Sequence, residues 1–212
     1  MSKPVVAAFD FDGTLSEGVS GLRFFRQLLG PARYHGWFWV RHLPSLVCYG
    51  MRWRHEASLD TINRAVFAGR LAADVETEAI LYAERELPRH LVAPAMRELR
   101  RHLAEGHRCL LVSRGYEAYL RPWARTLGID GVVATRLEVG PEGRLTGAMP
   151  EPSCDGEEKR ARLLQMIGNR DAWELHAYGD GPGDHAMLEE ADRAWIRTPA
   201  GFAPWRGKGR TA

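Results

Sequence analysis

The sequence is poor in cysteine, lysine and long hydrophobic runs, and each shortage narrows what the protein can be. Cys48, Cys109 and Cys154 lie far apart with no CxxC pair, which argues against a disulfide framework or a zinc site and favours a reducing, cytoplasmic environment. No apolar stretch approaches the roughly 18 residues of a spanning helix, and the N-terminus lacks the layout of a secretory signal peptide. The net charge is only +2, so we expect no nucleic-acid partner.

Arginine supplies nearly all of the positive charge, and lysine is rare. Lys3 and Lys208 are near the ends of the chain, which leaves Lys159 as the one internal lysine. Most lysines on helices are solvated. Lys159, however, falls in the first turn of a helix expected over residues 157–167, directly after Cys154-Asp-Gly. It is therefore a candidate phosphate contact.

Strand and helix patterns alternate through most of the chain. Apolar runs predict short buried strands, and segments with helical periodicity follow them. A polar–apolar alternation around Gly-Pro-Glu-Gly predicts a hairpin over 138–148, and the tail from residue 201 is expected to be loosely ordered. The predicted strands are 5–9, 108–112, 132–135, 175–178 and 194–196, and the predicted helices are 92–105, 116–127, 157–167 and 185–191.

This alternation predicts an α/β fold, a Rossmann-like parallel sheet with helices on both faces. Residues 17–90 look helical and interrupt the pattern after the first strand. An insertion at that point lies over the carboxyl ends of the strands, where open α/β sheets bind ligands. We therefore predict a core of residues 1–16 and 91–212, with residues 17–90 as a helical cap.

Four aspartates follow two of the predicted strands. Asp10 and Asp12 come directly after 5–9, and Asp180 and Asp184 follow 175–178. On neighbouring parallel strands these side chains would converge, and their repulsion would call for a cation. Oxygen ligands suit Mg²⁺. The alternative, a loop aspartate capping a helix, explains Asp184 by itself but not the closely spaced first pair.

Ser113, Arg114 and Gly115 lie where a predicted strand passes into a predicted helix. A serine hydroxyl and backbone N–H groups at a helix start form a seat for phosphate. A plain serine N-cap is the alternative.

Four segments together resemble the haloacid dehalogenase-like superfamily, in the branch that includes phosphoserine phosphatases. Residues 9–15 and 178–184 carry the more specific part of the resemblance. The segments, in chain order, are 9–15 (FDFDGTL), 111–113 (LVS), 156–159 (GEEK) and 178–184 (YGDGPGD).

The resemblance implies a role for each matched residue. Asp10 is similar to the nucleophile that forms an aspartyl-phosphate, and Asp12 to the general acid and base. Ser113 and Lys159 resemble the phosphate ligands. Implied ligands of Mg²⁺ are Asp10, the backbone carbonyl of Asp12, and Asp180, with Asp184 in support.

Two departures argue against phosphoserine as the substrate. Val19 stands where phosphoserine phosphatases carry a cap glutamate, and Arg114 stands where they have glycine. Arg114 either binds a second anionic group or faces solvent.

The segment 36–53 is rich in tryptophan and apolar residues. This composition is typical either of the packed interior of the cap or of an interfacial helix pair.

We expect a phosphatase acting on a small soluble phosphomonoester. Alternatives are a lipid or glycerol phosphate at the membrane surface, a phosphomutase, and a non-catalytic phosphate-binding module. The sequence leaves the substrate and the oligomeric state open.

Overall fold

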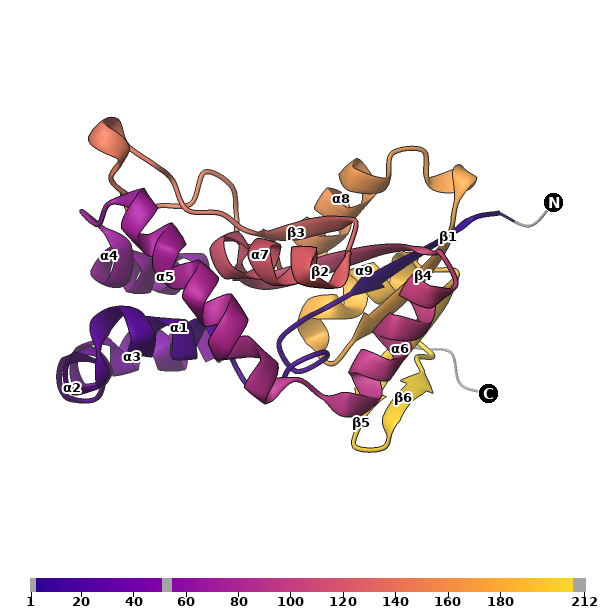
Figure 1. Ribbon diagram of the computed structural model, residues 1–212, viewed down its shortest axis with the longest axis horizontal. Helices are drawn as coiled ribbons and strands as arrows, with labels where there is room; N and C mark the ends of the chain where they lie inside the picture. The colour runs from indigo at the N-terminus through magenta and orange to yellow at the C-terminus, as the bar shows by residue number, and fades with distance from the viewer. Residues whose placement is uncertain (1–2, 51–54, 208–212) are drawn as a thin grey trace.

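A six-stranded sheet forms the centre of the molecule (Figure 1). The computed structural model describes residues 3–50 and 55–207. Strand order is β3-β2-β1-β4-β5-β6, in which β1 to β5 pair in parallel and β6 runs antiparallel to β5. The predicted Rossmann-like α/β class is confirmed. The strands are β1 (Val5–Phe9), β2 (Arg108–Tyr116), β3 (Gly131–Thr135), β4 (Glu174–Gly179), β5 (Arg193–Thr198) and β6 (Gly201–Pro204).

Helices cover both faces of the sheet. Successive side chains of a strand point to opposite faces, so Ala7 and Phe9 of β1 join one apolar cluster while Val6 and Ala8 join another. The first cluster is completed by α6 (Ala93–Ala104) and α7 (Glu117–Leu127), and the second by α8 (Gly156–Ile167) and α9 (His185–Glu190). Burial on both faces explains why β1 reads as an unbroken apolar run.

The segment between β1 and β2 is helical, as predicted, and its first five α-helices lie together at one end of the molecule (Figure 1). The boundaries predicted for a separate cap, 17–90, stay a prediction. The helices are α1 (Ser20–Leu29), α2 (Pro31–Arg33), the π-helical η1 (Tyr34–Phe38), α3 (Trp39–Gly50), α4 (His55–Phe67) and α5 (Ala72–Arg85). Short 3₁₀ turns elsewhere are η2 (Leu87–His90), η3 (Pro141–Gly143), η4 (Arg170–Ala172) and η5 (Pro182–Asp184).

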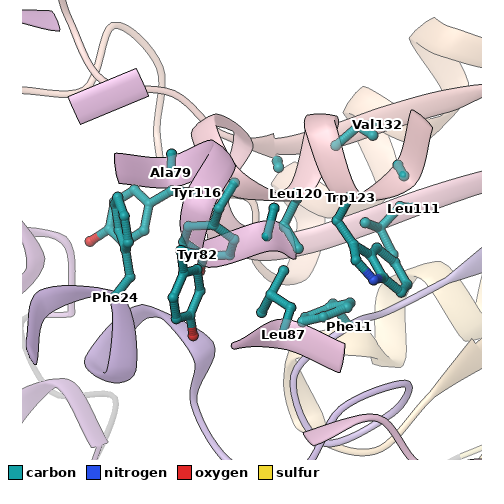
Figure 2. Close-up of a cluster of buried hydrophobic side chains, with 14 of the residues drawn as sticks. Phe11, Phe24, Ala79, Tyr82, Leu87, Leu111, Tyr116, Leu120, Trp123 and Val132 are labelled. Atoms are coloured by element: carbon teal, nitrogen blue, oxygen red, sulfur yellow. The ribbon is translucent and has the colours of Figure 1, made fainter. Parts of the chain in front are cut away.

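One continuous apolar cluster joins these helices to the sheet layer. Figure 2 shows Phe24 and Tyr82, from α1 and α5, beside Tyr116 and the α7 side chains. The ring centres of Phe24 and Tyr82 are each 5.2 Å from that of Tyr119 in α7, and Phe11 packs edge-on against Trp123 at 5.0 Å. Such aromatic pairs contribute about 0.5–1.5 kcal/mol beyond area burial. The inserted helices are thus held firmly over the carboxyl end of β1.

The predicted hairpin over 138–148 is confirmed. Val139 and Leu145 form an antiparallel bridge, and the Glu138 N–H donates to the Ala148 carbonyl. Its far strand also reaches the inserted helices, because Leu145 exchanges two backbone hydrogen bonds with the turn at Gly69 and Arg70. The prediction of a loose tail is wrong for 201–204, since these residues pair with β5 as an edge strand.

The aromatic segment 36–53 is split between burial and exposure. Phe38 is fully buried, whereas Trp37, Val40, Leu43 and Val47 are exposed. Residues 51–53 of this segment lie outside the described residues. Within 3–50 and 55–207, no helix has the length and apolar character to cross a bilayer. Contact with lipid and a cytoplasmic location both stay predictions.

Candidate active site

The acidic loops after β1 and β4 meet at one edge of the sheet. The two strands pair in parallel, with Phe9 opposite Tyr178. One carboxylate oxygen from each of Asp10, Asp180 and Asp184 lies within 4.8 Å of the others. Asp10 and Asp184 are buried, while Asp180 is exposed. The predicted convergence of the two loops is therefore present.

The donor set of this cluster fits Mg²⁺. All three groups are carboxylates, the ligands that hard divalent cations prefer. Burial and the nearby charge of Asp184 raise the pKa of Asp10 to about 8, although Lys159 acts in the opposite direction. Burial and Asp184 likewise raise the pKa of Asp180 to about 6. Protonation is favoured because the negative charge is under-compensated, and a bound cation would supply the missing positive charge.

Lys159 extends from the first turn of α8 into the acidic cluster. Its side chain is 2% exposed, and its Nζ donates to Asp10 Oδ1 at 2.8 Å and to Asp184 Oδ1 at 2.6 Å. Burial alone lowers the pKa of this amine, but the two carboxylates more than offset that effect and raise the pKa. Lys159 is thus held as a cation against the two buried aspartates.

Asp184 organises the loop as well as pairing with Lys159. Its Oδ2 accepts hydrogen bonds from the backbone N–H of Asp180 at 2.9 Å and of Gly181 at 3.2 Å. Burial raises the pKa of this carboxyl, but Lys159 and the two backbone donors outweigh it and the pKa is lowered. Asp184 therefore stays ionised and sets the position of Asp180.

Asp12 stands apart from the carboxylate cluster. Its Oδ1 accepts from the backbone N–H of Ser20, the first residue of α1, at 3.0 Å. The Asp12 carboxylate is thus not among the three carboxylates that could bind a metal ion. The resemblance implies a metal contact only for the backbone carbonyl of Asp12. Burial raises the pKa of Asp12, partly offset by the Ser20 hydrogen bonds. A carboxyl with a raised pKa suits a general acid.

Ser113, Arg114 and the other predicted residues share a single cavity of about 560 Å³. Ser113 is fully buried, and its Oγ accepts from the Gly115 N–H at 3.0 Å. Arg114 lies 3.8 Å from Asp155 in a long ion pair. The predicted residues that line the cavity are Asp10, Asp12, Ser113, Arg114, Lys159, Asp180 and Asp184.

The helix predicted over 116–127 is confirmed as α7 (Glu117–Leu127), but the strand before it is longer than the predicted 108–112. β2 continues through Ser113 to Tyr116, with an irregular register against β3. Ser113 is consequently no N-cap, and a helix dipole does not start at its hydroxyl. Its position on the cavity wall comes from the strand, and its contact with phosphate stays a prediction.

Three residues of the site were not singled out from the sequence. Thr14 donates to Asp10 Oδ2 at 2.9 Å, and Arg197 donates to the Gly13 carbonyl at 2.8 Å. Gly13 has φ +89°, and a Cβ there would lie 2.1 Å from Asp180 Oδ2. The Gly-Thr pair after the first two aspartates was the available signal for Gly13 and Thr14. Arg197 lies far along the chain from these residues, and no sequence signal indicated its contact with Gly13.

Comparison with known proteins identifies the family. The sequence model of haloacid dehalogenase-like hydrolases matches residues 7–189. This chain belongs to the haloacid dehalogenase-like hydrolase family. It is 32% identical over 206 residues to Protein CicA of Caulobacter vibrioides, a match that covers 97% of this chain and 89% of CicA. A phosphoserine phosphatase of Polaromonas sp. is 38% identical over 92 residues, or 41% of this chain and 39% of that protein.

Solved structures agree on the fold. A Bordetella pertussis Tohama I protein of unknown function superposes with a TM-score of 0.78 at 22% identity, over 94% of this chain and 93% of that one. A substrate-bound phosphoserine phosphatase superposes with a TM-score of 0.64 at 19% identity, over 92% and 86%. These structures share the fold of this chain, which agrees with its place in the haloacid dehalogenase-like hydrolase family.

Proposed function

We propose that the protein is a Mg²⁺-dependent phosphatase that hydrolyses a small phosphomonoester through a phosphorylated Asp10. The observation that carries this proposal is the setting of Asp10. Its buried carboxylate is held by Lys159 and Thr14, beside Asp180, on the wall of a cavity of about 560 Å³. A fixed carboxylate with cationic support is suited to attack an anionic phosphoryl group.

The reaction takes two displacements at phosphorus. In the first, a carboxylate oxygen of Asp10 bonds to phosphorus while the bond to the leaving oxygen breaks, and Asp12 donates a proton to that oxygen. In the second, water attacks phosphorus, Asp12 accepts its proton, and Asp10 is released with inorganic phosphate. Mg²⁺ bound by Asp10, Asp180 and the Asp12 carbonyl, with Asp184 in support, would neutralise phosphoryl charge. Lys159 provides a fixed positive charge throughout.

The two acids need different protonation states during the reaction. Asp10 contacts the Lys159 ammonium, which lowers its pKa against the larger effect of burial, and a bound cation would lower that pKa further. Asp12 is buried with hydrogen bonds from Ser20 and has its pKa raised. Its presence also argues against a non-catalytic binding module, which has no need of a proton donor next to the nucleophile.

The test is release of phosphate from p-nitrophenyl phosphate with and without Mg²⁺. Native protein is compared with Asp10→Asn and with Asp74→Asn, an exposed aspartate of α5 outside the cavity. We expect turnover that requires Mg²⁺, is abolished by Asp10→Asn and is retained by Asp74→Asn. Full activity of Asp10→Asn would overturn the proposal.

A further inference from the structure

A second cavity of about 330 Å³ lies beside the catalytic one, between α1, α3, α4 and β2. Asp12, Val19 and Arg114 line both cavities, so the second continues from the place where Asp12 meets the leaving oxygen. Its wall is mostly apolar, with side chains that include Leu22, Phe25, Trp39, Leu43, Leu59 and Ile62.

Charge is confined to the end that the two cavities share. Among the described residues that line the second cavity, the charged side chains are Asp12 and Arg114, both of which also line the catalytic cavity. Tyr116 places its ring in the wall, while its hydroxyl donates to Asn63 Oδ1 at 2.5 Å. Beyond the shared end, a charged leaving group would lose its hydration without gaining an ionic partner.

We infer that the substrate is a phosphomonoester of a hydrophobic alcohol. This inference rests on the proposed phosphatase activity. Phosphate occupies the cavity at Asp10 and Lys159, the ester oxygen faces Asp12, and the hydrocarbon fills the apolar cavity. Phosphoserine fits poorly, because its ammonium and carboxylate would both enter the apolar side past Val19.

The mouth of the apolar cavity allows two sources for such a substrate. Leu43 and Val47, one turn apart on α3, line the cavity and are 50% and 49% exposed. A soluble alkyl or aryl phosphate can enter there from water, and the hydrocarbon of a lipid phosphomonoester can enter from a membrane surface. Both share one chemistry, a phosphate ester next to a hydrocarbon.

The test measures kcat/KM with Mg²⁺ for ethyl, butyl, hexyl and octyl phosphate, with phosphoserine and p-nitrophenyl phosphate in parallel. Burial of a methylene group contributes about 0.8 kcal/mol, so kcat/KM should rise about fourfold per methylene until the cavity is full. Phosphoserine should fall below butyl phosphate. Phosphatidic acid in phosphatidylcholine vesicles is then compared with octyl phosphate below its micellar concentration. The higher kcat/KM of the two shows whether the substrate comes from a membrane surface or from water.

A matched pair of variants on α3 tests whether the dependence of kcat/KM on alkyl-chain length arises in the apolar cavity. Leu43→Asp places a charge at the cavity mouth and should reduce the octyl-to-ethyl ratio of kcat/KM at least tenfold. Val40→Asp, on the same helix but 78% exposed and outside the cavity, should keep the native ratio. Val47→Asp provides a second variant at the mouth, and circular dichroism checks the fold of all three.

The outcomes separate the inference from the proposed function. A flat chain-length series, or a preference for phosphoserine, in an enzyme that turns over p-nitrophenyl phosphate would overturn the inference and leave the phosphatase activity standing. An unchanged octyl-to-ethyl ratio in folded Leu43→Asp and Val47→Asp would also overturn it. Absence of turnover on every phosphomonoester would overturn both.

Discussion

Replacing Gly13 by alanine should destroy activity far more than it destroys stability. Gly13 has φ +89°, and the added Cβ would lie 2.1 Å from Asp180 Oδ2 and 2.5 Å from its Cγ. An L-residue in the left-handed region costs about 1–2 kcal/mol. The close contact additionally forces the Asp180 carboxylate away by about an ångström, and a misplacement of that size costs on the order of 100-fold in rate.

Gly69→Ala is the matched control, because Gly69 has φ +81° and a Cβ there would meet nothing within 4 Å. Both variants should lose about 1–2 kcal/mol in urea unfolding. We expect kcat/KM with Mg²⁺ to fall about 100-fold in Gly13→Ala and to stay near native in Gly69→Ala. Equal activity of the two variants would refute the reasoning, because the contact with Asp180 would then have no consequence.

Three further predictions concern the charged and titratable groups. Lys159→Met leaves two buried carboxylates without their cation and should cost about 3–5 kcal/mol in urea unfolding without Mg²⁺. Arg160→Met, at an exposed ion pair, should cost far less, and similar losses in the two variants would contradict this prediction. Burial, with Arg101 and His107, lowers the pKa of His102 to about 4, from a value near 6.5 in the unfolded chain. Between these two pH values the unfolded state binds a proton that the folded state does not. The free energy of unfolding therefore falls as the pH drops from 6.5 to 4, by up to about 3 kcal/mol. Unfolding of His102→Gln should depend less on pH there, and an unchanged slope would contradict the assignment. Finally, Mg²⁺ should raise the Tm of the native protein by mass action but raise that of Asp180→Asn much less, as thermal unfolding with and without a chelator would show; an equal rise would exclude Asp180 as a ligand.

The sheet and its acidic loops could be predicted because their signals are local. An unbroken apolar run followed by Asp10 and Asp12 marks a buried parallel strand and its polar end. The strand before Asp180 and Asp184 carries a weaker signal of the same kind, because His176 interrupts its apolar residues. That these two loops meet was an inference from α/β topology, and the pairing of β1 with β4 supports it. Lys159 stood out through its rarity, but its two ion pairs could not be read from that.

Features that depend on distant segments were missed. The edge strand at 201–204 has little apolar pattern of its own and forms because β5 offers a free edge. β2 runs past Ser113 to Tyr116, where it still pairs with Thr135 of β3, so the strand is longer than the predicted 108–112. The apolar cavity beside Asp12 is assembled from α1, α3, α4 and β2, and no short window of sequence contains it.

The most direct measurement is to trap the covalent intermediate. Protein mixed with a phosphomonoester and Mg²⁺ is quenched in acid within the first turnovers, digested, and analysed by mass spectrometry. We expect one phosphoryl group on the peptide that contains Asp10, at the Asp10 side chain, and none in Asp10→Asn. A phosphoryl group on any other residue, or turnover without phosphorylation of Asp10, would contradict the proposed mechanism.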